Sequence, residues 1–351
     1  MISKNKITLF QHSDVLLCLI ILAHVAVAYV MSLYAGGTQW LKLNGPIISY
    51  AYLAAFFSAF CLVYALIKGT ITRRLIPVLN DFINLRLFRG LIVFIFIGLF
   101  LGSFSSVKVM MPEFMPFTWD VIFADIDKAI HFGDPWQYLT SLDKYHGIIT
   151  LLYSGVWMVL HIALTLFICV SDFKIRTQYL YTFITTWIIC GNIIPLMFMA
   201  VGPIYFERLT GSPRFAELSD RIFGLPNEMT PQGRVADMLW QSYIDKDPFI
   251  GSGISAFPSM HVAISMLMFL TACKFNKGLG ALGLGFLVFT VIGSVNLAWH
   301  YAIDGYASII LVALIWMFWG RVFQTDNHAI VSSATSKVFS KKPEKGLVPA
   351  E

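Results

Sequence analysis

Eight apolar segments, each long enough to cross a lipid bilayer as a helix, constrain this sequence more than any other feature. A hydrocarbon core of about 30 Å is crossed by a helix of about 20 apolar residues. Such runs lie at about residues 15–34, 47–67, 91–110, 148–170, 180–201, 259–274, 279–298 and 301–320. Only 13% of the 351 residues are charged, against about 25% in an average soluble domain. The sequence therefore predicts an all-α, polytopic transmembrane bundle of about eight spans.

Charge and cysteine usage argue against several other classes of protein. The net charge of +5 is modest, and it is not gathered in the basic face of a nucleic-acid-binding domain. The five cysteines lie in apolar runs, without a CxxC motif or a Cys/His spacing typical of a metal site. We therefore predict no nucleic-acid partner, no metal and no cofactor, and the partner that the composition indicates is the bilayer.

The distribution of Lys and Arg residues predicts the orientation of the spans. An even number of spans places both ends of the chain on one side, and 16 of the 25 Lys and Arg residues belong to that side. Short positively charged loops stay in the cytoplasm. The sequence thus predicts cytoplasmic N- and C-termini, outer loops at 111–147 and 202–258, and a bacterial inner membrane as the location.

Two short polar segments flank the last spans. Residues 251–262 (GSGISAFPSMHV) contain Ser259 and His261, and residues 296–306 (NLAWHYAIDGY) contain His300 and Asp304. Because the intervening span crosses the membrane and the chain returns, all of these side chains are expected at the outer boundary. The spacing of four residues places His300 and Asp304 on one helix face. Ionisable residues at membrane depth are costly and usually functional.

This set of side chains suits phosphoryl transfer without a metal. A buried carboxylate that accepts one imidazole N–H leaves the other ring nitrogen as a directed nucleophile or base. A second imidazole can protonate the leaving oxygen, and the N–H groups that open the helix around Ser259 can hold phosphate. The rate is then expected to be bell-shaped around the reference imidazole pKa of about 6.5, shifted by burial and by Asp304.

The same segments resemble the motifs of the type 2 phosphatidic acid phosphatase superfamily. Its motif P-S-x-H matches residues 258–261, and its motif H-x-x-x-D matches residues 300–304. The resemblance covers roughly residues 115–320 and is closest in character to the branch of inositol phosphorylceramide synthases, sphingomyelin synthases and their bacterial relatives. It implies that His300 forms a phosphohistidine, that Asp304 orients it, and that His261 serves the leaving group and then activates the acceptor.

Further similarity to that branch lies outside the two motifs. It is found in GPIYFERL at 202–209 and, more weakly, in ADIDKAIHFGDPW at 124–136. The resemblance implies three regions. They are an N-terminal three-span region at 1–110, a catalytic membrane domain at 111–320, and a disordered cytoplasmic tail at 321–351.

Three departures from the phosphatase pattern favour the synthase-like branch. No R-P dipeptide occurs, so the first motif, K-x6-R-P, is not found; Ser294 stands where the third motif has arginine, and Met260 stands where many members have glycine. Arginines of the outer loop are then the candidates for phosphate binding, since a guanidinium grips phosphate bidentately. We expect Arg208 and Arg214 in this role, with ion pairing to the acidic residues of the same loop as the alternative.

The predicted function is that of a membrane lipid phosphotransferase or lipid phosphate phosphatase, similar to inositol phosphorylceramide synthase. Its substrate would be a lipid phosphate or a phospholipid, and its site would face outward. Donor lipid, acceptor and oligomeric state are not determined by the sequence. The alternative is a non-enzymatic transporter or lipid scaffold with a His/Asp proton relay. His24 and His161, which stand alone in apolar spans, are expected to form hydrogen bonds between helices.

Overall fold

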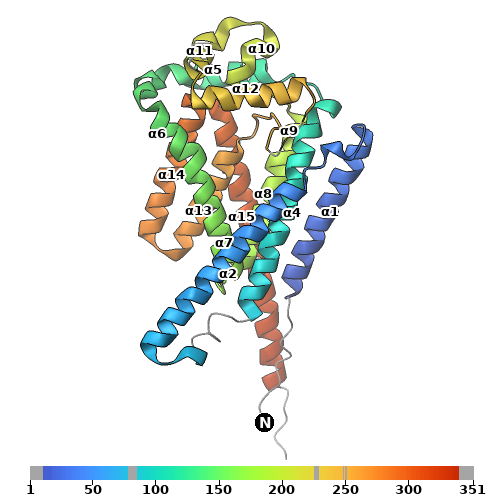
Figure 1. Cartoon of the computed structure of the whole chain (residues 1–351), viewed down its shortest axis with the longest axis vertical. Coiled ribbons are helices and arrows are strands. Elements are labelled where there is room, and N and C mark those ends of the chain that lie inside the picture. Colours follow the sequence, from blue (N-terminus) through green and yellow to red (C-terminus); the bar gives the residue numbers. More distant parts are fainter. Residues whose placement is uncertain (1–10, 78–84, 225–228, 248, 250, 340–351) are drawn as a thin grey trace, which may run out of the picture.

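The computed structural model describes residues 11–77, 85–224, 229–247, 249 and 251–339, and all regular structure in these residues is helical. Long helices run side by side along one axis (Figure 1). Seven helical segments of the described chain are long and apolar enough to cross a membrane. The eighth predicted span is α13 (Met260–Phe275), a shorter apolar helix of 16 residues. The predicted all-helical bundle of about eight spans is therefore confirmed.

The seven longer segments follow the predicted apolar runs. They are α1 (His12–Tyr34), α2 (Asn44–Thr72), α4 (Leu85–Phe114), the segment Pro135–Val170 with α6 (His146–Thr150) and α7 (Trp157–Val170), the segment Arg176–Met197 with α8 (Arg176–Ile188) and α9 (Ile194–Met197), α14 (Lys277–Asn296), and α15 (Ala302–Phe339), of which Ala302–Phe323 is the apolar part. Short π-helical stretches join α6 to α7 and α8 to α9.

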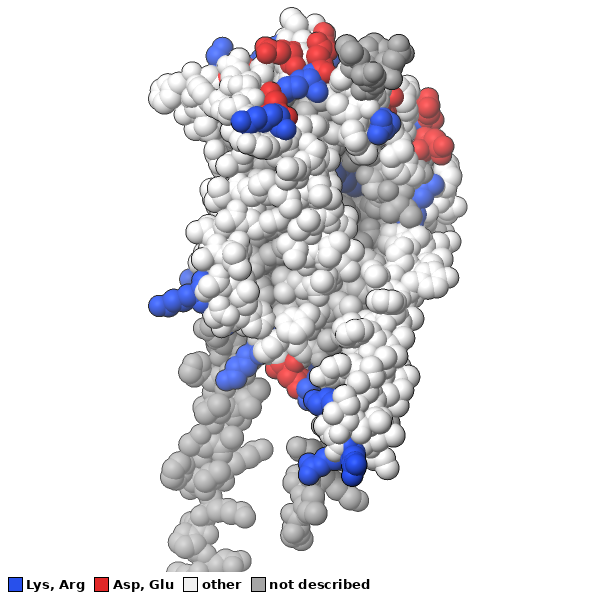
Figure 2. Space-filling view, turned by 60° about the vertical axis from the view of Figure 1, so that its left-hand side comes forward, with Lys and Arg blue, Asp and Glu red and all other residues white. Residues whose placement is uncertain are grey.

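Charged residues gather at the two ends of the bundle. Figure 2 shows an uncharged band around the middle of the visible face, with acidic and basic residues mixed at one end and mainly basic residues at the other. Large apolar side chains in the band are exposed, among them Phe56 at 74% and Leu282 at 72%. In a bilayer these side chains would face lipid, so this pattern is that of an integral membrane protein.

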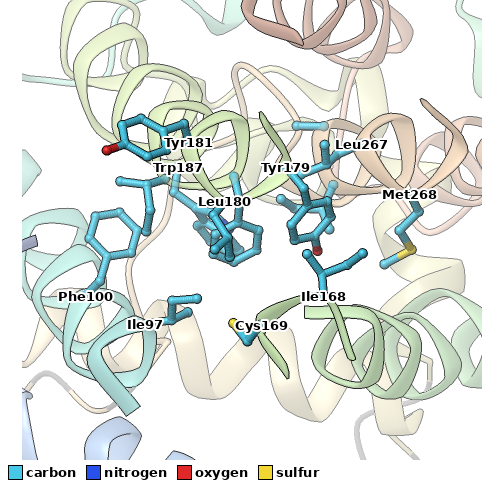
Figure 3. Close-up of a cluster of buried hydrophobic side chains, with 14 of the residues drawn as sticks. Ile97, Phe100, Ile168, Cys169, Tyr179, Leu180, Tyr181, Trp187, Leu267 and Met268 are labelled. Atoms are coloured by element: carbon cyan, nitrogen blue, oxygen red, sulfur yellow. The ribbon is translucent and has the colours of Figure 1, made fainter. Parts of the chain in front are cut away.

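One apolar core joins the first three spans to the rest of the chain. Leu17 of α1, Tyr50 of α2 and Phe94 of α4 belong to the same buried cluster as Phe183 of α8 and Leu267 of α13, part of which is drawn in Figure 3. Helix α4 also crosses residue 110 without interruption. The predicted division at this residue therefore does not separate two packing units.

Both predicted outer loops fold into a helical cap at one end of the bundle (Figure 1). The cap contains α5 (Asp120–His131), α10 (Phe206–Thr210), α11 (Ala216–Phe223) and α12 (Pro231–Ile244). Its own apolar core includes Phe123, Tyr205 and Phe215, and it continues into Tyr301 and Ala302 at the start of α15. The cap thus packs directly on the chain that carries His300.

The last helix is longer than the sequence prediction. Helix α15 continues to Phe339, whereas disorder was expected from residue 321. Residues 321–339 contain neither glycine nor proline, so nothing in them forces the helix to end. The described helix thus extends past the residue at which disorder was predicted to begin, and 340–351 lie outside the described residues.

The two lone histidines of the apolar spans differ in their surroundings. His24 hydrogen-bonds through Nδ1 to Ser103 Oγ at 2.8 Å and through Nε2 to Asn192 Oδ1 at 2.9 Å, which confirms the interhelical bonds predicted for it. His161 is also buried, but neither of its ring nitrogens has a hydrogen-bond partner among the described residues. The same prediction is therefore wrong for His161.

Candidate active site

His300 and Asp304 lie at the junction of α14 and α15. His300 is in the link between the two helices and Asp304 is in the first turn of α15. The distance from His300 Nδ1 to Asp304 Oδ2 is 3.2 Å, and the same carboxylate oxygen accepts the Tyr301 N–H at 3.1 Å. Asp304 has no exposed surface. Because the carboxylate engages Nδ1, Nε2 of the neutral ring is left as the nucleophilic nitrogen.

The predicted His300–Asp304 pair is present, although the backbone that carries it is not the continuous helix that was expected. Both residues were expected on one helix face, whereas His300 precedes the helix. The Tyr301 N–H bond places the carboxylate at the opening of α15, where unpaired N–H groups favour an acceptor. The loop conformation therefore brings the ring to the carboxylate.

His261 lies in the first turn of α13 between aromatic rings of the neighbouring span. Its ring stacks on Tyr153 with centroids 4.3 Å apart and an interplanar angle of 17°, and it contacts Trp157 at 4.3 Å. Trp157 Nε1–H donates a 3.0 Å hydrogen bond to the carbonyl of His261. These contacts on both ring and backbone restrict the imidazole to one orientation.

Ser259 joins the two candidate histidine segments through its backbone. Its N–H donates to the carbonyl of Asp304 at 3.2 Å, and its carbonyl accepts the Ser308 hydroxyl at 2.8 Å. The start of α13 is thereby held against the first turns of α15. This use of the Ser259 N–H does not agree with its expected role in a phosphate cradle, and Ser259 does not line the cavity described next.

A cavity of about 700 Å³ lies between the cap and the membrane helices, and both His261 and His300 line it. The two imidazoles are close enough to interact electrostatically. Most of the remaining wall is apolar and comes from α2, α4, α7, α8 and the cap. Representative lining residues are Tyr50, Phe104, Trp157, Trp187 and Leu239. No described lining residue is an aspartate or a glutamate.

Lys108 is a cavity residue that the sequence prediction missed. It is the only lysine or arginine among the described lining residues, and its charge acts on both His261 and His300. It lies near the end of the predicted third span at 91–110, and the sequence prediction gave it no role. Since α4 continues to Phe114, Lys108 lies inside the helix.

One pattern in the sequence could have revealed this lysine. Six residues separate Lys108 from Met115-Pro116, so the chain has the lysine and the proline of K-x6-R-P with methionine at the arginine position. Only the arginine of that first motif is therefore missing. A search for the R-P dipeptide does not detect Lys108, because methionine replaces the arginine of that dipeptide.

The two predicted phosphate-binding arginines lie in the cap and do not line the cavity. Arg208 bonds Asp237 at 3.2 Å and packs over the ring of Phe223. Arg214 bonds Asp134 at 2.7 Å and Asp125 at 2.6 Å. Their guanidinium groups are thus occupied by carboxylates. The partner of Arg208 lies in the same loop, as the alternative interpretation had it, whereas the partners of Arg214 lie in the other outer loop. The structure supports a role in holding the cap together.

Two buried aspartates of α5 clamp the link that carries His300. Asp120 accepts the Gly202 N–H at 2.9 Å and the Tyr301 hydroxyl at 2.9 Å. Asp127 accepts the N–H groups of Ala302 at 2.8 Å and Ile303 at 3.1 Å. Burial raises the pKa of both carboxyl groups, and the N–H donors oppose that shift.

Gly202 allows the cap to approach this link closely. Its φ is +88°, and a Cβ at this position would lie 2.5 Å from the carbonyl oxygen of Trp299. The neighbouring Ile204 N–H donates to the carbonyl of Ala298 at 3.0 Å. The segment 202–209, whose sequence resembles the synthase-like branch, therefore holds the link that carries His300 through its backbone.

The fold and this site define an integral membrane protein of the phosphatase or phosphotransferase type. Residues 121–318 match the PAP2 superfamily, and the chain belongs to that superfamily. The matched part includes His261, His300 and Asp304, whereas Lys108 precedes it. No curated protein and no solved structure matches the chain.

Proposed function

We propose that this protein transfers a phosphoryl group from a membrane lipid to an acceptor through a covalent intermediate on His300. The observation that carries the proposal is the buried His300–Asp304 pair beside His261 and Lys108 in one largely apolar cavity. The apolar wall suits a lipid chain, and the lysine charge suits a phosphate. The positive charges come from side chains, so the proposed mechanism requires no metal.

In the first step, Nε2 of neutral His300 attacks phosphorus and the bond between phosphorus and the lipid oxygen breaks. Protonated His261 gives its proton to the departing oxygen, so the lipid alcohol leaves neutral. Lys108 offsets the charge on the phosphoryl oxygens, and the anionic phosphate itself favours the protonated form of the neighbouring imidazole. Asp304 stabilises the positive charge that develops on His300.

In the second step, His261 removes a proton from the acceptor hydroxyl, whose oxygen attacks phosphorus. The bond between phosphorus and His300 breaks, and both histidines return to their starting states. Water as acceptor gives a lipid phosphate phosphatase. The resemblance to inositol phosphorylceramide synthases supports a lipid or polyol alcohol as a second acceptor, which would make the protein a phosphotransferase.

We further propose that the site faces outward from a bacterial inner membrane. The described start of α1 and the described end of α15 lie at the pole opposite the cap (Figure 1). Basic residues predominate at that pole on the face shown in Figure 2. Basic loops are retained in the cytoplasm, which supports an exoplasmic position for the cap and the cavity.

The test of the proposed function uses the purified chain in lipid nanodiscs with a chelator present. Phosphatidate labelled in its phosphate would be supplied first alone and then with a candidate alcohol acceptor. Release of phosphate, or formation of a new phosphoester, is the expected result. Lack of turnover with phosphatidate, isoprenyl phosphates and phosphoinositides alike would contradict the proposal.

The pH dependence should differ from that of an ordinary imidazole. Burial, followed by the charge of Lys108, lowers the pKa of His300 to about 3. The neutral ring is the nucleophile, and it is lost only when the pH falls through this lowered pKa. We therefore expect the acid limb of kcat/KM to lie well below pH 6.5.

The comparison of wild-type protein with Lys108→Met isolates this effect. The substrate phosphate ionises in the same way for both proteins. Any difference between their pH profiles of kcat/KM therefore arises from the groups of the site. Loss of the lysine charge should raise the pKa of His300 and move the acid limb to higher pH. Coincident profiles would show that Lys108 does not act on the nucleophile.

Asp127→Ala should impair the site through the backbone of α15. Its loss leaves two helix-opening N–H groups without their acceptor, which costs roughly 1–2 kcal/mol of stability. Displacement of the His300 link is expected to lower kcat roughly tenfold or more. Thermal unfolding and kcat would be measured beside Lys128→Ala, an exposed change on the same helix. A lower melting temperature with unchanged kcat would restrict Asp127 to a stabilising role.

A further inference from the structure

The cavity that holds the two candidate histidines has a rim of exposed side chains. Four described side chains both line the cavity and are exposed: Ser49 of α2, Ser154 and Met158 of the segment Pro135–Val170, and Val235 of α12. Met158 is 47% exposed and Val235 44%, whereas Trp157, deeper in the same wall, is 3% exposed. These four residues therefore mark an opening of the cavity, which we call the port.

The helices around the port are held by α4 and not by one another. Helices α2 and α7 both pack on α4, and among the described residues they make almost no contact with each other or with α12. Gly98 of α4 allows α2 to approach closely, because a Cβ at this position would lie 2.6 Å from the Cβ of Tyr50. Figure 1 shows α2 running obliquely to the other long helices. The packing on α4 thus keeps the port open between α2 and α7.

The port lies at the depth of the apolar band. Leu151, on the cap side of Ser154, is 62% exposed, and Val159, farther along the same segment, is 66% exposed. On the other side of the port, Ile48 precedes Ser49 and is 51% exposed. Apolar side chains exposed in this band would face lipid. Hydrocarbon therefore extends to the cap side of the port, and the port opens into the bilayer.

A lipid bound for the proposed reaction has to extend from the cavity into the bilayer. Its phosphate lies at the two histidines, whereas its hydrocarbon chains belong among the lipids. None of the four port residues is charged, which suits a chain. Helix α2 forms one side of the path through Gly45, Pro46, Ser49 and Tyr50, and it lies outside the residues matched to the superfamily. We propose that a hydrocarbon chain of the substrate occupies the port and that α2 thereby selects substrates by their chains.

This proposal rests on the proposed function for its substrate, and two lipids with the same headgroup test it. Dioleoyl phosphatidate has chains that must pass through the port, whereas the chains of dihexanoyl phosphatidate are too short to require it. Ser49→Trp and Ser154→Trp each place a large ring on one side of the port. We expect kcat/KM for the dioleoyl lipid to fall roughly tenfold or more, since overfilling a packed space is costly. The loss for the dihexanoyl lipid should be much smaller.

Matched controls place the same ring on the same two helices, away from the port. Tyr52 of α2 and Val159 of α7 are 73% and 66% exposed, and neither lines the cavity. Tyr52→Trp and Val159→Trp should therefore leave kcat/KM for both lipids at the wild-type value. Met158→Ala widens the port and should raise kcat/KM for a phosphatidate with methyl-branched chains relative to the dioleoyl lipid. Thermal unfolding of each variant would establish that the fold is intact.

Equal losses for the two lipids in folded Ser49→Trp and Ser154→Trp, or no loss for the dioleoyl lipid in either variant, would overturn the proposal. Equilibrium binding of both lipids to His300→Ala protein, with and without Ser154→Trp, separates it from the proposed function. If the wild type turns over neither lipid but the added ring weakens binding of the dioleoyl lipid alone, the port stands and the proposed reaction does not. Turnover of both lipids without any effect of chain length has the opposite meaning.

Discussion

His300→Ala should reduce turnover of a lipid phosphate by at least about 10³-fold and abolish covalent labelling of the protein. The change removes the nitrogen that would attack phosphorus, while the carboxylate of Asp304 keeps its bond to the Tyr301 N–H. The measurement is rapid acid-free quenching of protein mixed with phosphate-labelled lipid, followed by detection of an acid-labile, base-stable phosphoimidazole. Initial rates would be measured on the same samples.

The control for this experiment is His12→Ala, which changes an exposed histidine at the start of α1. It should leave both rate and labelling at wild-type levels. Thermal unfolding of each variant would establish that the fold is intact. Persistent labelling of His300→Ala would show that another group carries the phosphoryl intermediate and would remove His300 from its proposed role.

Lys108→Met should lower kcat/KM by about 10²–10³-fold, a loss typical of removing one group that stabilises transition-state charge. Lys108 is the only lysine or arginine among the described cavity-lining residues, so its loss leaves no other such cation there for the phosphoryl oxygens. Lys108→Arg should retain part of the activity because it preserves the charge. Inhibition by orthovanadate should weaken in parallel, which reports on binding of a phosphate-like anion independently of turnover.

Stability provides a second readout for this variant. No ion pair is present for Lys108 among the described residues, and removing an unpaired, half-buried charge is expected to leave stability unchanged or increased. Lys246→Met, a change in a surface lysine that pairs with Glu113, is the matched control. Normal activity of Lys108→Met, combined with a large loss of activity in Arg208→Met, would show that an arginine of the cap binds the phosphate and that Lys108 does not.

Hydropathy and two short motifs predicted much of this protein because each depends on local sequence. A helix must present about 20 apolar residues to cross a bilayer, so the eight spans were evident without any tertiary contact. His261, His300 and Asp304 stand in motifs whose residues are close in sequence. The cavity shared by His261 and His300 follows from the two crossings that return the chain to the same side.

The sequence could not show which cation is available to bind phosphate, because the environment of each one depends on distant parts of the chain. Arg214 looked available, yet its partners Asp125 and Asp134 lie 80 or more residues away. Lys108 stands near the end of an apolar run, and only the packing of α4 places it in the cavity wall. Residue type alone could not distinguish a paired guanidinium from an unpaired ammonium.

The sequence by itself determined the membrane environment, the number of spans and the candidate nucleophile with its carboxylate, since these depend on composition and on spacing within one segment. Only the tertiary structure decided which cation lines the cavity of the two histidines and how α5 holds the start of α15. The physical reason is that hydrogen bonding and burial are properties of neighbours in space. Those neighbours here come from helices far apart in the chain.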